Sequence, residues 1–136
     1  MLKLIITPRF CDIDGLGHVN NTRISEWFDE AILPIYRVFN PELDFDKWNI
    51  ILARVEIDYV KQLRLNTPVE IRSVISKIGN TSFTVQNEVW QNNELRTKGA
   101  IVAVHFDFKN QQPVPIPDDI RNILKIHLDE KEQCTI

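Results

Sequence analysis

The sequence contains few of the residues that mark several large classes of protein. Only two of its 136 residues are cysteines, Cys11 and Cys134 near opposite ends, so neither a disulfide framework nor a thiolate metal site is indicated. Both cysteines are expected to be free thiols. The first apolar run is too short for a signal peptide, and no stretch reaches the roughly 18 apolar residues of a membrane span. A cytoplasmic protein without a membrane span is therefore expected.

An excess of positive charge is also absent. The 16 Lys and Arg residues against 19 Asp and Glu give a formal net charge of −3, and no segment gathers the basic density that nucleic-acid binding requires. Histidine, cysteine and carboxylate residues show no metal-ligand spacing, so neither a metal nor another cofactor is expected. The length suits a single domain, residues 1–136, with the composition of an ordinary globular protein.

The clearest periodic pattern predicts one long amphipathic helix at residues 22–39. Apolar side chains recur at the i, i+3, i+4, i+7 spacing, and charged side chains occupy the opposite face. Asn20 or Asn21 is expected to cap the start of this helix. Pro34 is expected to kink the helix or to mark a break near its last turn.

Most of the remaining sequence is typical of strands. Residues 2–10 form a first expected strand, and residues 53–59 alternate between apolar and charged side chains. A strand opening at Val69 with a bulge before Val74 is followed by one around residues 83–89, and then by a hairpin turn at residues 91–94 into a strand ending at Phe108. Asp118 is expected to cap a short final helix, and the last ten residues to fray. This order predicts an α+β fold in which an antiparallel sheet wraps one long central helix.

The residues best suited to chemistry lie in the loop ahead of the long helix. Asp12 and Asp14 form a carboxylate pair, and His18, Asn20 and Asn21 follow within a few residues. The first N–H groups of a helix lack internal partners and carry partial positive charge, so this end can hold an oxyanion while a carboxylate activates water. The alternative interpretation is that these residues only form turns and caps, which use the same residue types.

The same loop carries a resemblance to a known family. Residues 9–21, R-F-C-D-I-D-G-L-G-H-V-N-N, resemble the opening motif of the 4-hydroxybenzoyl-CoA thioesterase-like family, and the likeness extends over nearly the whole chain. The later segments that share it in order and spacing are V-E-I-D-Y at residues 55–59, V-E-I at 69–71, I-G-N-T-S-F at 78–83, A-I-V-A-V at 100–104 and P-I-P at 115–117.

The resemblance implies a hotdog fold, a homodimer or homotetramer, and a thioester site at the subunit interface. The family's catalytic carboxylate corresponds to Asp14, and its helix-end backbone donors to Asn21 and Thr22. The implied reaction is hydrolysis of an acyl-CoA to the free acid and coenzyme A, with Asp14 acting as general base or nucleophile. This sequence has Asn21 where some members have a histidine, and Gln62 where a proline is frequent.

Other polar residues have two interpretations each. His18 is a candidate to orient water or Asp14, or else to tie the loop to a backbone carbonyl. Asp12 is interpreted as a turn or cap residue. His105 and Asp107 share a strand face without a nucleophile, and are interpreted as a solvated strand end. Candidates for contacts to coenzyme A, each alternatively an ordinary surface or strand-start residue, are Lys61, Arg64, Lys77, Lys98 and Ser82.

Three further functions remain open at this point. A non-catalytic hotdog that binds an acyl chain or a partner is disfavoured by the presence of Asp14, and a hotdog dehydratase by the absence of histidine from the helix. A thioesterase acting on an acyl-carrier-protein thioester stays possible. The acyl group is not encoded, because the candidate tunnel residues Leu16, Ile24, Trp27 and Phe28 also fit the apolar stripe of a core helix.

Overall fold

The computed structural model describes residues 1–128 of the chain. Residues 129–136, which include Cys134 and most of the segment expected to fray, lie outside the described part. Within it, Cys11 is a free, exposed thiol as predicted. No helix in residues 1–128 is long and apolar enough to cross a membrane.

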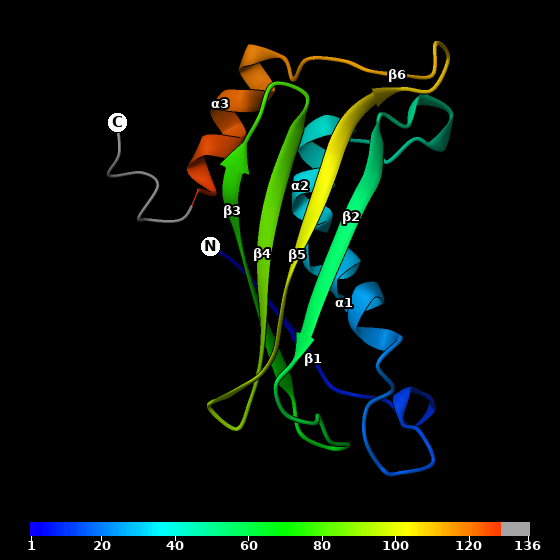
Figure 1. The fold of residues 1–136 in the computed structure, drawn as a ribbon, viewed down its shortest axis with the longest axis vertical. Helices are drawn as coiled ribbons and strands as arrows, with labels where there is room; N and C mark the ends of the chain where they lie inside the picture. The colour runs from blue at the N-terminus through cyan, green and yellow to red at the C-terminus, as the bar shows by residue number, and fades with distance from the viewer. Residues whose placement is uncertain (129–136) are drawn as a thin grey trace.

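The main element is a six-stranded antiparallel sheet (Figure 1). Its path runs in the order β1-β3-β4-β5-β2, and β6 pairs with β5. Strand β2 is therefore one edge of the sheet. The strands are β1 (Leu2–Ile6), β2 (Ile50–Tyr59), β3 (Val69–Ile78), β4 (Ser82–Gln91), β5 (Glu94–Asp107) and β6 (Gln112–Pro113).

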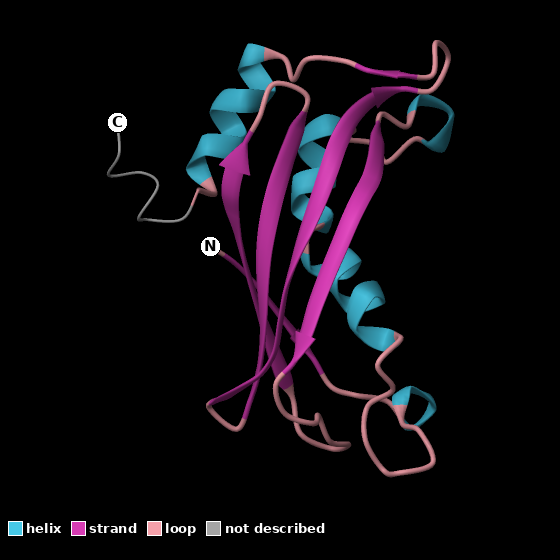
Figure 2. Cartoon of the chain, in the orientation of Figure 1, coloured by secondary structure: helices cyan, strands magenta, loops and turns pink. Residues whose placement is uncertain are grey.

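Two helices, α1 (Arg23–Ala31) and α2 (Leu33–Phe39), lie against one face of this sheet, and α3 (Asp118–Ile126) lies beside β3 (Figures 1 and 2). The expectation of one long central helix is therefore wrong, because the helical path is interrupted at Ile32. Pro34 explains the interruption: it has no N–H to donate to the carbonyl of Glu30, and its ring would collide with that carbonyl in a continuous helix. Pro34 instead occupies the first turn of α2, where a proline is tolerated.

The core lies between the helices and the concave face of the sheet. Apolar residues of α1 at the predicted helical spacing pack against alternate residues of β3, β4 and β5. The apolar face of the helix and the apolar face of each strand therefore enclose the same core. The most deeply buried of these side chains are Ile24, Phe28, Ile32, Ile35, Ile71, Ile75, Phe83, Val85 and Ile101.

Several boundaries differ from the expected ones. Strand β1 ends at Ile6 rather than at residue 10, because Pro8 and a 3-10 helix, η1 (Phe10–Asp12), follow it. The irregularity in β3 falls between Ile75 and Lys77 rather than before Val74. Helix α3 begins at Asp118 itself, whose carboxylate lies in the first turn and does not cap the helix. A second 3-10 helix, η2 (Phe45–Lys47), precedes β2.

The hairpin between β4 and β5 is confirmed. Gln91 pairs with Glu94, and the two residues between them, Asn92 and Asn93, have φ angles of 54° and 58°. A two-residue hairpin turn with positive φ at both central positions favours asparagine, because its short polar side chain tolerates this conformation.

Candidate active site

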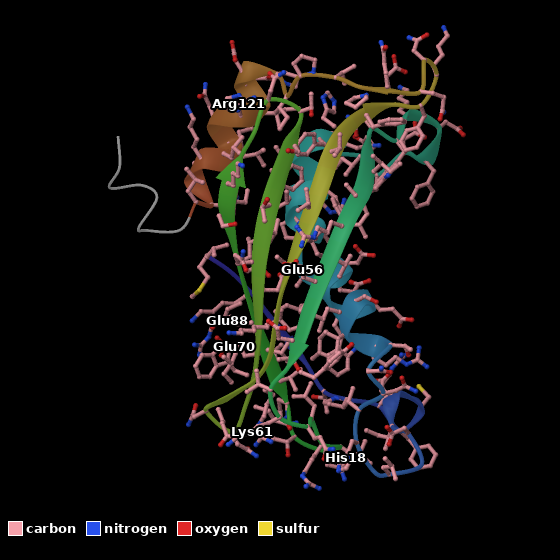
Figure 3. The ribbon with its side chains drawn as sticks, in the orientation of Figure 1. His18, Glu56, Lys61, Glu70, Glu88 and Arg121 are labelled. Carbon is pink, nitrogen blue, oxygen red and sulfur yellow. The ribbon has the colours of Figure 1, made fainter. Side chains whose placement is uncertain are left out.

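A cavity of about 560 Å³ opens where α1 begins and β2 ends. It combines the loop before α1 with the segment after β2, which are far apart in the sequence. Figure 3 shows His18 and Lys61 at this end of the sheet and Arg121 at the opposite end. The residues that line it are Asp14, Leu16, His18, Val19, Asn21, Ile24, Tyr59, Val60, Lys61, Gln62, Leu63 and Thr97.

The loop before α1 is anchored by the buried carboxylate of Asp12, which is only 1% exposed. Its Oδ2 accepts a hydrogen bond from the backbone N–H of Arg9 at 2.8 Å, and its Oδ1 lies 3.2 Å from Nη2 of Arg9 and 3.4 Å from Nε of Arg23. Burial raises the pKa of Asp12, but the hydrogen bonds from Arg9 and the charges of Arg9 and Arg23 outweigh burial and hold the pKa below its ordinary value. The interpretation of Asp12 as a cap is confirmed, and its ion pair with Arg23 also fixes the loop to α1.

Asp14 is held differently from Asp12. Its Oδ1 accepts hydrogen bonds from the backbone N–H groups of Leu16 at 2.9 Å and His18 at 3.3 Å, and its own N–H donates to the carbonyl of His18 at 2.8 Å. Its Oδ2 accepts no hydrogen bond from any residue in 1–128. The hydrogen bonds to Oδ1 thus orient the carboxylate. Oδ2 has no hydrogen-bond partner among the described residues, and Asp14 lines the cavity.

The start of α1 distinguishes the two predicted backbone donors. The N–H of Thr22 donates to the side-chain oxygen of Asn20 at 3.0 Å, and the Thr22 hydroxyl donates to the same oxygen at 2.9 Å. The N–H of Asn21 donates to none of the residues that the structure describes. Of the two predicted donors, only Asn21, which lines the cavity, keeps a backbone N–H free of residues 1–128. The expectation that Asn20 or Asn21 caps the helix is wrong, because the N-cap residue is Thr22 and it has no side-chain cap bond. Asn20 instead holds the turn before the helix through its bond to Thr22.

The other wall of the cavity is the segment that follows β2, and it is tied to the loop through backbone bonds. The N–H of Val19 donates to the carbonyl of Leu63 at 2.9 Å, and His18 forms a β-bridge with Arg64. Gln91, at the end of β4, exchanges two hydrogen bonds of 3.0 and 2.9 Å with the backbone of Arg64. The buried side chain of Gln91 thus fixes this wall from the β4–β5 hairpin.

The predicted histidine and cations have different surroundings. The ring of His18 has no hydrogen bond within the described chain, so the suggested bond from its ring to a carbonyl is not present. Nζ of Lys61 lies 3.0 Å from Oε1 of Glu94, whereas the guanidinium of the exposed Arg64 has no ion-pair partner among residues 1–128.

Three further candidates lie away from this cavity. Lys77 and Ser82 flank the turn between β3 and β4, at the opposite end of the sheet. Lys98 lines a separate cleft with Arg72 and Glu88. Within one protomer, these residues are not brought to Asp14.

The remaining sequence-based candidates are largely structural. Trp27 and Phe28 lie in the core and do not line the cavity, whereas Leu16 and Ile24 do. His105 and Asp107 make no dyad: Nδ1 of His105 lies 3.1 Å from the carbonyl of Pro115, and the Asp107 carboxylate accepts bonds from residues 109 and 110. No group of three or more His, Cys, Asp and Glu residues in the described range is placed to hold a metal.

Sequence reasoning missed Tyr59 and Thr97 as cavity residues. Tyr59 is the last residue of β2, and its hydroxyl donates to the carbonyl of Asn21 at 3.1 Å. The alternation of Tyr59 with Ile57 predicted a half-buried strand, but nothing in the sequence connects Tyr59 with a loop 38 residues earlier. Thr97 pairs with Tyr59 across β2 and β5 and reaches the cavity through that pairing.

An antiparallel sheet curled around buried helices, with a cavity at the helix start, defines the hotdog class of fold. The chain belongs to the thioesterase-like superfamily, whose family model matches residues 8–124. The resemblance inferred from the sequence is thereby confirmed.

Solved structures agree with this assignment. A predicted thioesterase from Bacillus stearothermophilus is 41% identical, with a TM-score of 0.92 over 94% of this chain and 96% of that one. A thioesterase from Thermus thermophilus, crystallised with coenzyme A and zinc, is 27% identical, with a TM-score of 0.82 over 91% and 97% of the chains. A gentisyl-coenzyme A thioesterase, at 20% identity and a TM-score of 0.77 over 90% and 98%, shares the fold. No curated protein sequence matches the chain.

Proposed function

We propose that the protein hydrolyses an acyl-CoA thioester to the free acid and coenzyme A, with Asp14 as the catalytic carboxylate. The observation that carries this proposal is that two groups without a hydrogen-bond partner in residues 1–128 belong to residues of the same cavity. Asp14 and Asn21 both line it, and within residues 1–128 one carboxylate oxygen of Asp14 accepts no hydrogen bond and the backbone N–H of Asn21, just before α1, donates none. The coenzyme A bound to the Thermus thermophilus relative supports the choice of thioester.

The proposed chemistry follows from these two groups. As general base, Asp14 takes a proton from water while the water oxygen bonds to the thioester carbon; as nucleophile, the carboxylate bonds to that carbon and water later hydrolyses the resulting anhydride. In both routes the carbonyl oxygen becomes negative, and the C–S bond then breaks as the electron pair leaves with the coenzyme A sulfur. The N–H of Asn21 and the positive end of α1 stabilise the oxyanion.

His18 has a supporting role in this proposal. Its backbone N–H and carbonyl both bond to Asp14, so it sets the direction of that carboxylate. His18 lines the cavity, and its imidazole has no hydrogen bond to the described residues, which leaves the ring available to orient the attacking water.

Arg64 and Lys61 are the proposed partners of the coenzyme A phosphates from the same protomer. Arg64 lies beside His18 and is not neutralised by an acid of residues 1–128, so it is the stronger candidate. Lys61 lines the cavity but is already paired with Glu94, and a phosphate would have to compete with that carboxylate.

We also propose that the protein acts as a homodimer or homotetramer that pairs along β2. This edge strand exposes apolar residues on its concave side: Leu52 is 44% exposed, Val55 37% and Tyr59 54%. Open edges with such residues favour pairing with another strand. Antiparallel pairing of two β2 strands would place the Ile50 end of one beside the Tyr59 end of the other, and so bring Lys77 and Ser82 of the partner subunit toward the cavity.

The test is release of free thiol from a panel of thioesters. Aliphatic acyl-CoAs of increasing chain length, aromatic acyl-CoAs and acyl-carrier-protein thioesters are compared at catalytic protein concentration, since each of the two cysteines of the chain can react with a thiol reagent only once. We expect turnover of at least one acyl-CoA. Faster turnover of carrier-protein thioesters would identify that substrate class instead. Absence of turnover across the panel would favour a non-catalytic acyl-binding protein.

A further inference from the structure

Tyr59 connects the sheet to the start of α1. It is the last residue of the edge strand β2, and its hydroxyl donates a hydrogen bond to the backbone carbonyl of Asn21 at 3.1 Å. Both residues line the cavity that contains Asp14. The same carbonyl also accepts the N–H of Ile24 at 3.3 Å, so Asn21 receives one bond from the helix and one from the sheet.

The peptide group between Asn21 and Thr22 is held at both of its polar atoms. Tyr59 donates to its carbonyl oxygen, and its N–H donates to the side-chain oxygen of Asn20 at 3.0 Å. Fixing this peptide restricts the backbone angles of Asn21. The N–H of Asn21, which belongs to the preceding peptide and is free of the described residues, is thereby directed.

We propose that Tyr59 is a positioning residue for oxyanion stabilisation, which acts by holding the Asn21 backbone so that its N–H points at the reacting carbonyl. This inference rests on the proposed hydrolysis. A donor that is aimed before the reaction needs no reorganisation when charge develops on the oxygen, and its stabilisation then appears in the transition state rather than in substrate binding.

Tyr36 provides a matched control. It is the other of the two tyrosines in the sequence, and its hydroxyl also donates to an acceptor on α1, Oδ1 of Asp29, at 2.9 Å. Tyr36 does not line the cavity. Tyr36→Phe therefore removes a comparable hydroxyl without touching the start of the helix.

The kinetic test compares Tyr59→Phe with Tyr36→Phe on the best acyl-CoA of the panel. Loss of a single hydrogen bond that acts through another group should lower kcat of Tyr59→Phe by roughly 3- to 10-fold, with KM within about 2-fold of the parental value. Tyr36→Phe should keep both constants. An unchanged kcat, or a loss confined to KM, would overturn the positioning role, since the latter would make Tyr59 a substrate contact.

A second measurement does not depend on turnover. Amide hydrogen exchange of Thr22, followed by NMR in the intact protein, should accelerate several-fold in Tyr59→Phe and stay at the parental rate in Tyr36→Phe. Equal exchange in the two variants would show that Tyr59 does not hold this peptide. If the parental protein cleaves no thioester, hydrolysis is refuted, but this exchange result still decides whether Tyr59 fixes the helix start.

Discussion

Replacing Asp14 with asparagine tests the proposed chemistry most directly. Asparagine has the shape of aspartate, and its side-chain oxygen can still accept the N–H groups of Leu16 and His18 that orient Oδ1. The oxygen that becomes an amide NH₂ is the one that accepts no bond from residues 1–128. The substitution therefore removes negative charge and basicity while leaving the loop bonds in place.

The expected loss follows from the role of a base or nucleophile. We expect kcat to fall by roughly 10²- to 10⁴-fold, which corresponds to about 2.7–5.4 kcal/mol of transition-state stabilisation. KM should change little, because contacts to the coenzyme and the acyl group are retained. The melting temperature should stay within a few degrees of the parental value. Steady-state thiol release and a thermal melt on the same preparation measure all three quantities.

Asp12→Asn is the matched control, two residues away in the same loop. Its carboxylate is buried and bound to Arg9 and Arg23, so its substitution should cost about 1–3 kcal/mol of folding stability. Its kcat per folded molecule should stay within roughly 3-fold of the parental value. Near-parental turnover by Asp14→Asn, or a larger catalytic loss in Asp12→Asn, would show that the catalytic carboxylate has been assigned to the wrong residue.

Three other predictions concern assembly, metal and pH. Light scattering should give two or four times the chain mass of 15.9 kDa, and Val55→Glu on the exposed edge should lower that mass and the activity together; a fully active monomer would contradict the interfacial site. EDTA should leave turnover unchanged, and a loss restored by a divalent metal would refute a metal-free mechanism. The pKa of Asp12 lies below its ordinary value of 3.8, so its stabilisation is present above about pH 4 and is lost as pH falls through the lower folded-state pKa. The difference in unfolding free energy between the parental protein and Asp12→Asn should therefore be constant from about pH 5 to 7 and shrink below about pH 4, and a difference that persists at lower pH would exclude this ion pair as its cause.

Strands and the helical face were predictable where one periodicity dominates. In β3 and β4, alternate side chains are buried in a single core. The apolar residues Ile71, Ile75 and Val85 therefore predict which face of each strand is buried. The break at Ile32 was harder to place, because the buried residues on both sides continue one apolar stripe and only Pro34 marks the interruption. The local sequence predicts the apolar stripe of the helices. The position where α1 ends depends on the hydrogen bond that Pro34 cannot donate.

The candidate site also has a part that the sequence predicts and a part that it does not. Asp14 and the helix-end donors, Asn21 and Thr22, could be proposed from the motif at residues 9–21 and the residue after it, since all of them are near in sequence. The N–H of Thr22 donates to the side chain of Asn20 because of the orientation of that side chain. Sequence spacing does not predict such an orientation. The pairing of Lys61 with Glu94 depends on a distant hairpin. Such long-range contacts arise only when the sheet is complete.

The bonds from Gln91 to Arg64 lead us to expect that the cavity is completed late in folding. One wall forms only after the β4–β5 hairpin has turned and presented a side chain that is 27 residues further along the chain. Contacts of this sequence separation carry a loop-closure cost that local helix formation does not. A nascent chain that has already exposed Asp14 and the whole of α1 therefore still lacks this wall of the cavity. We expect the proposed hydrolysis to appear only when the sheet has docked, so its appearance would time the last stage of folding.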